Sequence, residues 1–300
     1  MAYLLNNDHF RSGIIVHTSY SIARNVSNMA ENKFFLSWFC VIIFISHLSY
    51  PELIVNVKTR SGHYTRQYLT ADPEKDIVTI DFTMPDGTKT KALIDFSKSL
   101  QVLKTAVLGE MERGEKPIHT LCFILKFSPS EFISSDAVSK LRQKNPEAIR
   151  IPEEELKTEF LVMEKEIPFG NSGLFSGHVH QMCGDADKIY TSVENIKAIA
   201  QGNENVFKDL LSSVTTINSN DSAVSRCDTV ADKHSKCICH YEFCLSWYPC
   251  ALKYCDDNGQ EGERVSYRCG IKTCGKCRQF QYHVDHHDSC FWETPFVTVQ

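Results

Sequence analysis

The sequence lacks the short motifs that accompany the common enzyme chemistries. It contains no G-x-S-x-G nucleophile elbow, no H-E-x-x-H helix, no P-loop and no dinucleotide fingerprint. Residues 170–173 (GNSG) resemble an elbow only loosely and are typical of a loop. A catalytic cysteine would need a free thiol poised by a histidine, and no cysteine is obviously spare. We therefore expect no enzymatic activity and no cofactor.

Clustered positive charge is also missing. The 32 Lys and Arg residues are spread along the chain, and together with 37 Asp and Glu residues they give a formal net charge of −5. Nucleic acids and anionic membranes are bound by basic patches or basic runs. The charge pattern therefore argues against a nucleic-acid partner and against a polybasic membrane contact.

Long hydrophobic runs are scarce, and one uncharged, mostly apolar run of twelve residues spans 34–45. It is shorter than the roughly 20 apolar residues of a bilayer-spanning helix, but it matches the core of a secretory signal peptide. Lys33 supplies a positive charge before it if translation starts at Met29. A buried helix and a type II signal anchor are the alternatives. We expect residues 1–50 to be an N-terminal extension and signal peptide, and the mature chain to be secreted and extracellular, with no membrane contact.

Cysteine, in contrast, is abundant. Of thirteen cysteines, Cys40 lies in the apolar run, so signal removal would leave an even twelve. Ten of them lie in residues 226–300, which have too few apolar side chains to be stabilised by burial alone. In a secreted chain these cysteines are expected to form disulfides, each contributing about 2–4 kcal/mol. The twelve are Cys122, Cys183, Cys227, Cys237, Cys239, Cys244, Cys250, Cys255, Cys269, Cys274, Cys277 and Cys290.

Metal binding is the main alternative for the cysteines and for two histidine groups. Cys274 and Cys277 form a C-x-x-C knuckle, but a second pair at similar spacing is lacking. His178 and His180 would share a face if their segment were a strand, and residues 283–287 contain three histidines and an aspartate. Surface histidines without an evident third ligand are common, so we expect no metal site.

Apolar alternation and turn residues predict strands in the first half of the chain. The expected strands and hairpins cover residues 53–69, 77–96, 118–127 and 158–167. Apolar spacings of three and four predict two amphipathic helices. The first begins at Ser97 and carries Leu100, Leu103, Val107 and Met111; the second carries Ala186, Ile189, Tyr190 and Val193.

A polar stretch without periodicity separates this half from the cysteine-rich end. We assign residues 51–205 to a first domain, 206–226 to a linker, and 227–300 to a cysteine-rich domain of mostly β or irregular structure. The linker contains an N-x-S sequon, which in a secreted chain predicts a glycan on Asn220.

Asp95 lies between a predicted strand and the predicted helix that begins at Ser97. A carboxylate at a helix N-terminus is stabilised by the helix dipole, and this is the ordinary interpretation. Burial between sheet and helix could instead raise the pKa of the Asp95 carboxyl and make the joint sensitive to pH. The sequence leaves both interpretations open.

Asp95 before an amphipathic helix, Cys122 on a buried strand and a distant Cys183 together resemble a BRICHOS domain. That family is built around one aspartate and two disulfide-bonded cysteines. The resemblance implies an α+β fold for residues 51–205, with a small antiparallel sheet flanked by two helices. It also implies that Asp95 is the BRICHOS-type carboxylate and that Cys122 bonds to Cys183, which would contribute roughly 4 kcal/mol.

A closer resemblance extends over residues 51–292. Three segments are similar to the out at first family: 141–146 (LRQKNP), 237–255 (CICHYEFCLSWYPCALKYC) and 267–274 (YRCGIKTC). The resemblance implies a secreted developmental protein with a BRICHOS-like module followed by a cysteine-rich module. Vertebrate members lack counterparts of Cys244 and Cys277, which suggests that these two bond to each other. The pairing of the other eight C-terminal cysteines stays open.

Together these features predict a secreted, non-enzymatic glycoprotein that acts in development through an extracellular protein partner. Two alternatives stay open. BRICHOS domains generally shield β-prone segments, so the chain could be a chaperone, although no bare apolar strand is evident as its client. The other alternative is a structural zinc-binding protein, in which the cysteines bind metal.

Overall fold

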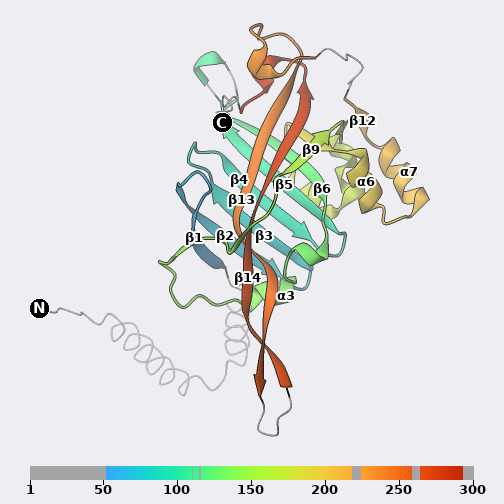
Figure 1. Cartoon of the computed structure of the whole chain (residues 1–300). Helices are drawn as coiled ribbons and strands as arrows, with labels where there is room; N and C mark the ends of the chain where they lie inside the picture. The colour runs from blue at the N-terminus through green and yellow to red at the C-terminus, as the bar shows by residue number, and fades with distance from the viewer. Residues whose placement is uncertain (1–51, 110, 115, 218–223, 259–263, 293–300) are drawn as a thin grey trace, which may run out of the picture. The chain divides into compact units, whose positions relative to one another are not determined.

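Figure 1 shows the protein as a computed structural model. The predicted signal segment and the predicted glycosylation site Asn220 lie outside the residues that it describes. Those residues are mostly β, and they belong to one compact unit, 50–300. No helix in the described part of the chain combines the length and the apolar character needed to cross a membrane. The structure describes residues 52–109, 111–114, 116–217, 224–258 and 264–292.

The larger of two sheets has ten strands in the order β12-β10-β11-β6-β5-β4-β3-β2-β1-β7. Strands β1 to β6 form an antiparallel meander, because each of them pairs with the next one along the chain. In the predicted turn between β3 and β4, Gly87 has a φ of 88°, which glycine adopts without steric cost. The meander strands are β1 (Leu53–Lys58), β2 (Tyr64–Asp72), β3 (Ile77–Thr83), β4 (Lys89–Asp95), β5 (Leu100–Leu108) and β6 (Ile118–Lys126).

Short strands extend this sheet at both edges. At one edge β7 runs parallel to β1. At the other edge β11 runs parallel to β6, and β10 and β12 follow in antiparallel pairing. The meander therefore sits in a mixed sheet whose added strands are β7 (Ile149–Arg150), β10 (Lys165–Glu166), β11 (Lys188–Thr191) and β12 (Thr215–Thr216).

The second sheet is built on one long hairpin of β13 (Cys237–Asn258) and β14 (Arg264–Val284). Figure 1 shows this hairpin crossing a face of the larger sheet. β8 (Glu154–Glu155) and β9 (Glu159–Met163) pair with β14 in parallel. Strands from the segment predicted as the first domain, 51–205, therefore complete the sheet of the cysteine-rich segment.

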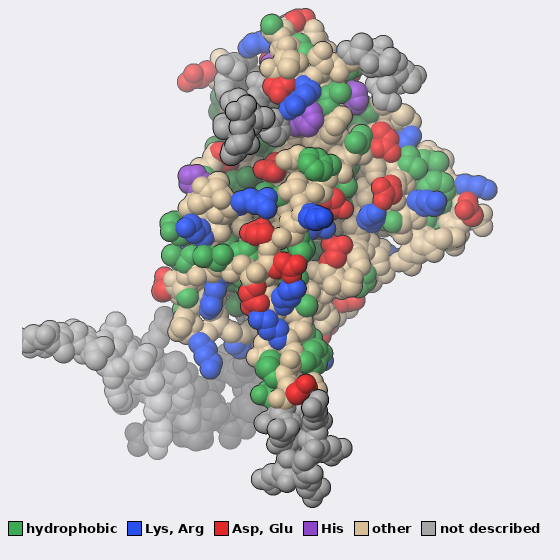
Figure 2. Space-filling view, in the orientation of Figure 1, with side chains coloured by type: hydrophobic (Ala, Val, Ile, Leu, Met, Phe, Trp, Pro, Cys, Tyr) green, Lys and Arg blue, Asp and Glu red, His purple; other side chains and the backbone are tan. Residues whose placement is uncertain are grey.

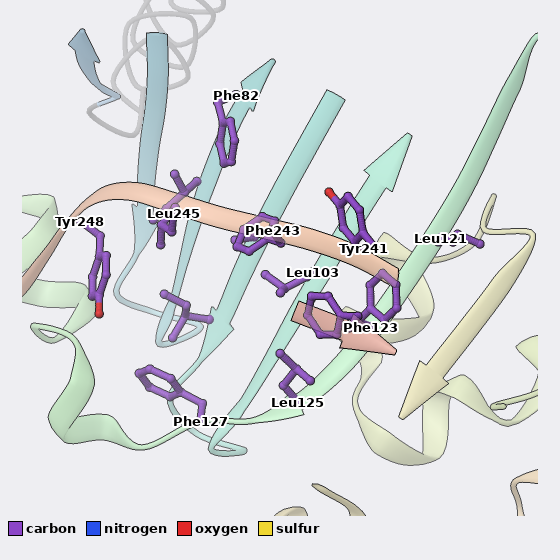
Figure 3. Close-up of a cluster of buried hydrophobic side chains, with 14 of the residues drawn as sticks. Phe82, Leu103, Leu121, Phe123, Leu125, Phe127, Tyr241, Phe243, Leu245 and Tyr248 are labelled. Carbon is purple, nitrogen blue, oxygen red and sulfur yellow. The ribbon is translucent and has the colours of Figure 1, made fainter. Parts of the chain in front are cut away.

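An aromatic core joins the hairpin to the larger sheet (Figure 3). Phe123 of β6 is fully buried, and its ring stacks on Phe280 of β14 with the ring centroids 4.2 Å apart. It also stacks on Tyr241 of β13 at 5.9 Å. The Tyr241 hydroxyl donates a hydrogen bond to Oγ1 of Thr105 in β5, at 3.1 Å. Hairpin and sheet therefore share one core.

Helices cover the opposite face of the larger sheet. Side chains alternate between the faces of a strand, so Cys122 and Ile124 of β6 pack with the helices while Phe123 packs with the hairpin. The covering helices are α4 (Ser172–Phe175), α5 (Gly177–Met182), α6 (Val193–Ile199) and α7 (Glu204–Ser212), while α3 (Ser135–Ser139) lies beside β2. Short 3₁₀ turns are η1 (Met111–Arg113), η2 (Pro129–Glu131), η3 (Phe169–Asn171), η4 (Cys227–Thr229) and η5 (His287–Ser289).

The predicted α+β fold, a small antiparallel sheet flanked by two helices, is wrong. The described chain is mostly β, and its larger sheet is mixed and ten-stranded. The segment predicted as the first helix is strand β5, paired with β4 and β6 along its length. Both faces of β5 are buried, so apolar side chains occur on both, and Leu100, Leu103 and Val107 imitate helical spacing.

Other local predictions divide between confirmed and wrong. The hairpins at 53–69 and 77–96 and the buried strand at 118–127 are confirmed. The predicted second helix is wrong, because Ile189 and Tyr190 lie in strand β11 and α6 begins only at Val193. The division into two domains and a linker stays a prediction; within the segment 206–226 assigned to the linker lie the end of α7 and strand β12.

Candidate functional site

The β13–β14 hairpin carries eight cysteines, and the structure pairs them all, together with Cys227 before the hairpin and Cys290 after it. Three disulfides cross between its two strands, and two more tie β13 to the segments that precede and follow the hairpin. The five bonds are Cys227–Cys237, Cys239–Cys290, Cys244–Cys277, Cys250–Cys274 and Cys255–Cys269. Cys244 and Cys277 are directly opposite in the ladder, so their bond follows from the strand register. The hairpin is therefore stapled at intervals along its length.

Only part of the hairpin lies against other strands. β8 and β9 pair with β14 between Cys274 and Tyr282, whereas residues 253–258 and 264–270 pair only with each other among the described strands. We call these two segments the distal arm. An isolated two-stranded ribbon is marginally stable in water, which gives the Cys255–Cys269 bond its structural role.

The distal arm exposes aromatic side chains. Tyr254 is 59% exposed and Tyr267 is 50% exposed. Figure 2 shows hydrophobic side chains, a class that includes tyrosine, gathered on this end of the hairpin beside the residues drawn in grey. The arm is thus a narrow, stapled surface that projects beyond the shared core.

The remaining bridge joins Cys122 of β6 to Cys183, the residue that follows α5. This is the pairing that the BRICHOS resemblance implied. All twelve cysteines of the described residues are therefore disulfide-bonded, and none offers a thiolate for zinc. Among the described residues, the three-donor group that the geometry brings together is Glu242 with Cys244 and Cys277, whose sulfurs are bonded to each other.

Asp95 ends β4 and is 1% exposed. Its Oδ1 accepts hydrogen bonds from Ser97 Oγ at 2.7 Å and from the Lys98 N–H at 3.0 Å. Its Oδ2 accepts one from Ser176 Oγ at 3.2 Å and lies 3.0 Å from His178 Nδ1. The carboxylate therefore ties the β4–β5 turn to the N-terminal end of α5.

Both sequence interpretations of Asp95 need correction. The turn after Asp95 leads into strand β5, so the residue does not lie at a helix N-terminus. Burial raises the pKa of the carboxyl, but the hydrogen bonds from Ser97, His178 and the Lys98 N–H lower it more, and the pKa lies below its ordinary value of 3.8. Asp95 is thus a charged joint between sheet and helix.

Asp95→Asn is expected to lower the free energy of unfolding at pH 7 by about 2 kcal/mol, typical of losing a hydrogen bond to a charged group. Because the pKa of Asp95 is lower in the folded chain, the unfolded chain takes up its proton first as the pH falls. The stabilisation is complete above about pH 5, begins to fall near the unfolded pKa of about 4, and is lost as the pH falls through the lower pKa of the folded chain. Urea unfolding at pH 7 and pH 3 measures it, and a wild-type-to-variant difference that is equally large at both pH values contradicts the assignment.

The structure gives His178 and His180 separate partners. The segment is helix α5 and not a strand, and His178 contacts Asp95. Nδ1 of His180 lies 2.9 Å from Ser172 Oγ, and its ring stacks on Phe169 with the ring centroids 4.6 Å apart. The two imidazoles therefore do not form the pair that a strand would have made.

A groove of about 1050 Å³ lies where β13 begins and β14 ends. Opposite charges on its walls are paired, as in Lys188–Glu166 at 2.7 Å and Lys236–Asp285 at 4.0 Å. Figure 2 shows histidine side chains gathered at this end of the molecule. The histidines that line the groove are His119, His234, His283 and His286.

His234 was not among the candidate ligands taken from the sequence. It comes from the segment before β13, and the structure places it beside His286, 52 residues further along the chain. No local spacing signals such a pair, because only the closing of the long hairpin brings its two ends together. His283 and His286 of the predicted group line the same groove.

Two models of one family match successive segments of the chain. The model described as Out at first matches residues 51–199, and the one described as Out at first, C-terminal matches residues 226–294. The chain is 37% identical to the Out at first protein of Drosophila virilis over 268 residues, 85% of this chain and 87% of that protein. It is 34% identical to the Out at first protein of Drosophila melanogaster over 284 residues, 88% of this chain and 58% of that protein. No solved structure matches the chain.

These matches correspond to the structural parts described above. The first covers the meander, its edge strands except β12, and most of the helices; the second covers the stapled hairpin. The resemblance stated from three short segments is confirmed by relatives that align over most of the chain. The chain belongs to the out at first family.

Proposed function

We propose that the chain is a secreted, non-enzymatic developmental factor that acts by contacting an extracellular protein. Six disulfides among the described residues favour an oxidising compartment, because such bonds persist in secreted proteins and are rare in the cytosol. Membership of the out at first family supports the developmental role. A glycan on Asn220 belongs to the same proposal, because N-x-S sequons are modified in secreted chains.

The observation that carries the proposed mode of action is the distal arm. Tyr254 and Tyr267 are exposed on a ribbon that the Cys255–Cys269 bond holds in one shape. Tyrosine is enriched in the few residues that dominate protein–protein binding energy. A preordered ribbon also loses less conformational entropy when it binds. We assign the contact with the protein partner to this arm.

The chaperone alternative finds less support. A BRICHOS-type chaperone would offer an apolar sheet face to β-prone clients, and here β13 covers that face of the larger sheet. Phe243 of β13 is 1% exposed and packs beside Phe82 of β3, with ring centroids 6.0 Å apart. A client would therefore have to displace a hairpin whose aromatic side chains are buried in the core that it shares with the larger sheet. Zinc as a ligand of the cysteines is disfavoured because every described cysteine is bonded to another.

The test uses full-length protein expressed in insect cells and recovered from the culture medium. Binding to the surface of cells from developing tissue is measured by flow cytometry over a range of protein concentrations. Replacing both Tyr254 and Tyr267 by serine is expected to weaken binding at least tenfold, as loss of a central aromatic contact does. The disulfide-stapled backbone of the arm should be unaffected by these exposed substitutions.

Tyr64→Ser is the matched control, because Tyr64 is 65% exposed but lies on β2, outside the distal arm. It should bind like the wild-type protein. Retention of the protein inside the cells would refute secretion. Equal binding by the wild-type protein and the double variant would refute the assignment to the arm.

A further inference from the structure

Two histidines from distant parts of the chain face each other at the groove. His234 precedes β13 and His286 follows β14, and both side chains are exposed. Their ring centroids are 6.1 Å apart and the ring planes are nearly perpendicular, at 85°. Neither residue takes part in the proposed function, whose contact surface is the distal arm at the other end of the hairpin. The pair can therefore be considered by itself.

The hydrogen bond of His286 determines which of its nitrogens can bind a ligand. Nδ1 of His286 lies 3.3 Å from the carbonyl oxygen of His234. A carbonyl oxygen only accepts, so in this contact Nδ1 carries the proton and Nε2 keeps its lone pair. Metal-binding histidines are usually held in this way, with the non-ligating nitrogen donating to a carbonyl or a carboxylate. His286 thus has the tautomer that a metal ion needs.

Disulfides hold the backbone on both sides of the pair. His234 lies within the short loop that the Cys227–Cys237 bond closes. His286 lies four residues before Cys290, which is bonded to Cys239 near the start of β13. The two segments therefore stay close to each other while the exposed imidazoles remain able to rotate. Such anchoring reduces the entropy lost when both side chains bind one ion.

The spacing of the rings is close to that required by one metal ion. With metal–nitrogen bonds of about 2.0–2.1 Å, two imidazoles on a tetrahedral ion have their ring centres about 5 Å apart. The observed 6.1 Å needs an inward movement of about 1 Å, well within the freedom of exposed side chains. Asp285 and Asp288 line the same groove and are exposed, so each carboxylate is a candidate third ligand. Asp285 also lies 4.0 Å from Lys236, and this exposed ion pair would have to open for Asp285 to bind the ion.

We propose that His234 and His286 form a binding site for a divalent transition-metal ion, Zn²⁺ or Cu²⁺, completed by the carboxylate of Asp285 or Asp288. Neutral imidazole and carboxylate together suit these two ions, whereas Ca²⁺ and Mg²⁺ prefer sites made of oxygen alone. The bound ion would link the segment before the hairpin to the segment after it. This site is distinct from the cysteines of the described residues, all of which are bonded in disulfides.

Isothermal titration tests the site on the full-length secreted protein after treatment with EDTA and dialysis. Addition of ZnCl₂, and of CuCl₂ in a separate run, is expected to show saturable uptake of about one equivalent. His234→Ala and His286→Ala should each weaken the uptake at least tenfold. One of the two variants Asp285→Asn and Asp288→Asn should also weaken the uptake, but by less than the loss of either histidine does. Because all four side chains are exposed, the variants should keep the wild-type circular dichroism spectrum.

His63→Ala is the matched control, since His63 is an exposed histidine in the turn between β1 and β2. It should leave the uptake of both ions unchanged. Absence of saturable uptake by the wild-type protein overturns the proposal. Wild-type affinity in either His234→Ala or His286→Ala overturns it equally, because the ion would then be bound elsewhere.

Discussion

Replacing both Cys122 and Cys183 by alanine is expected to lower the free energy of unfolding by about 4 kcal/mol. The bond joins residues 61 positions apart in the chain, so it removes much of the freedom of the unfolded state. Both cysteines are fully buried between β6 and the helices that cover it, where water cannot compensate for lost contacts. For a unit of this size, such a loss corresponds to a fall in Tm of about 10 °C.

Thermal unfolding followed by circular dichroism measures this effect. The matched control removes the Cys255–Cys269 bond by replacing both cysteines with serine. That bond lies in the distal arm, whose described strands pair only with each other, so the arm should open before the main transition. The main transition should therefore move by no more than about 2 °C. An equal fall in Tm for the two variants would show that burial and position make no difference. An unchanged Tm for the Cys122 and Cys183 variant would show that the bond is dispensable.

Phe123→Ala is expected to destabilise the protein by about 4 kcal/mol, within the range seen when a buried aromatic side chain is truncated. Phe123 has no exposed surface and stacks on Phe280 and Tyr241 of the hairpin. Its ring also packs near Tyr190 of β11, with ring centroids 5.8 Å apart. The cavity would therefore open at the centre of the contact between the two sheets.

Urea unfolding of the purified variant measures the loss. Phe160→Ala is the matched control, because Phe160 lies on β9 and is 75% exposed. Its removal should change the free energy of unfolding by no more than about 0.5 kcal/mol. A loss below about 1.5 kcal/mol for Phe123→Ala would mean that hairpin and sheet do not depend on this stack.

Local structure could be predicted where turn residues flanked strands whose apolar side chains alternate toward one face of the sheet. The turn at Gly87 was predicted because glycine adopts a positive φ, and the strands on both sides of it because their apolar residues recur with a period of two. Prediction failed at β5 because this strand is buried by the hairpin on one face and by helices on the other. Its apolar residues then follow no two-residue period, and the spacing of Leu100, Leu103 and Val107 is ambiguous.

The candidate sites were also predictable only in part. Abundant cysteines, an even twelve once Cys40 of the predicted signal segment is set aside, predicted disulfides, and the structure bonds all twelve among the described residues. Their pairing in the hairpin depended on strand register, which residue types alone do not specify. Asp95 was singled out from the sequence, but its four partners come from the following turn and from the start of α5. The direction of its pKa shift followed from those partners and not from burial alone.

Residue types and short spacings were enough to predict the family, the cysteine-rich C-terminal segment and most of the antiparallel strands. Tertiary structure alone decided that the hairpin lies on the larger sheet, that β8 and β9 complete the sheet of the other half, and that His234 meets His286. The physical reason is that these contacts join segments tens of residues apart. Their formation depends on which apolar faces pack against each other, and local sequence patterns do not specify this.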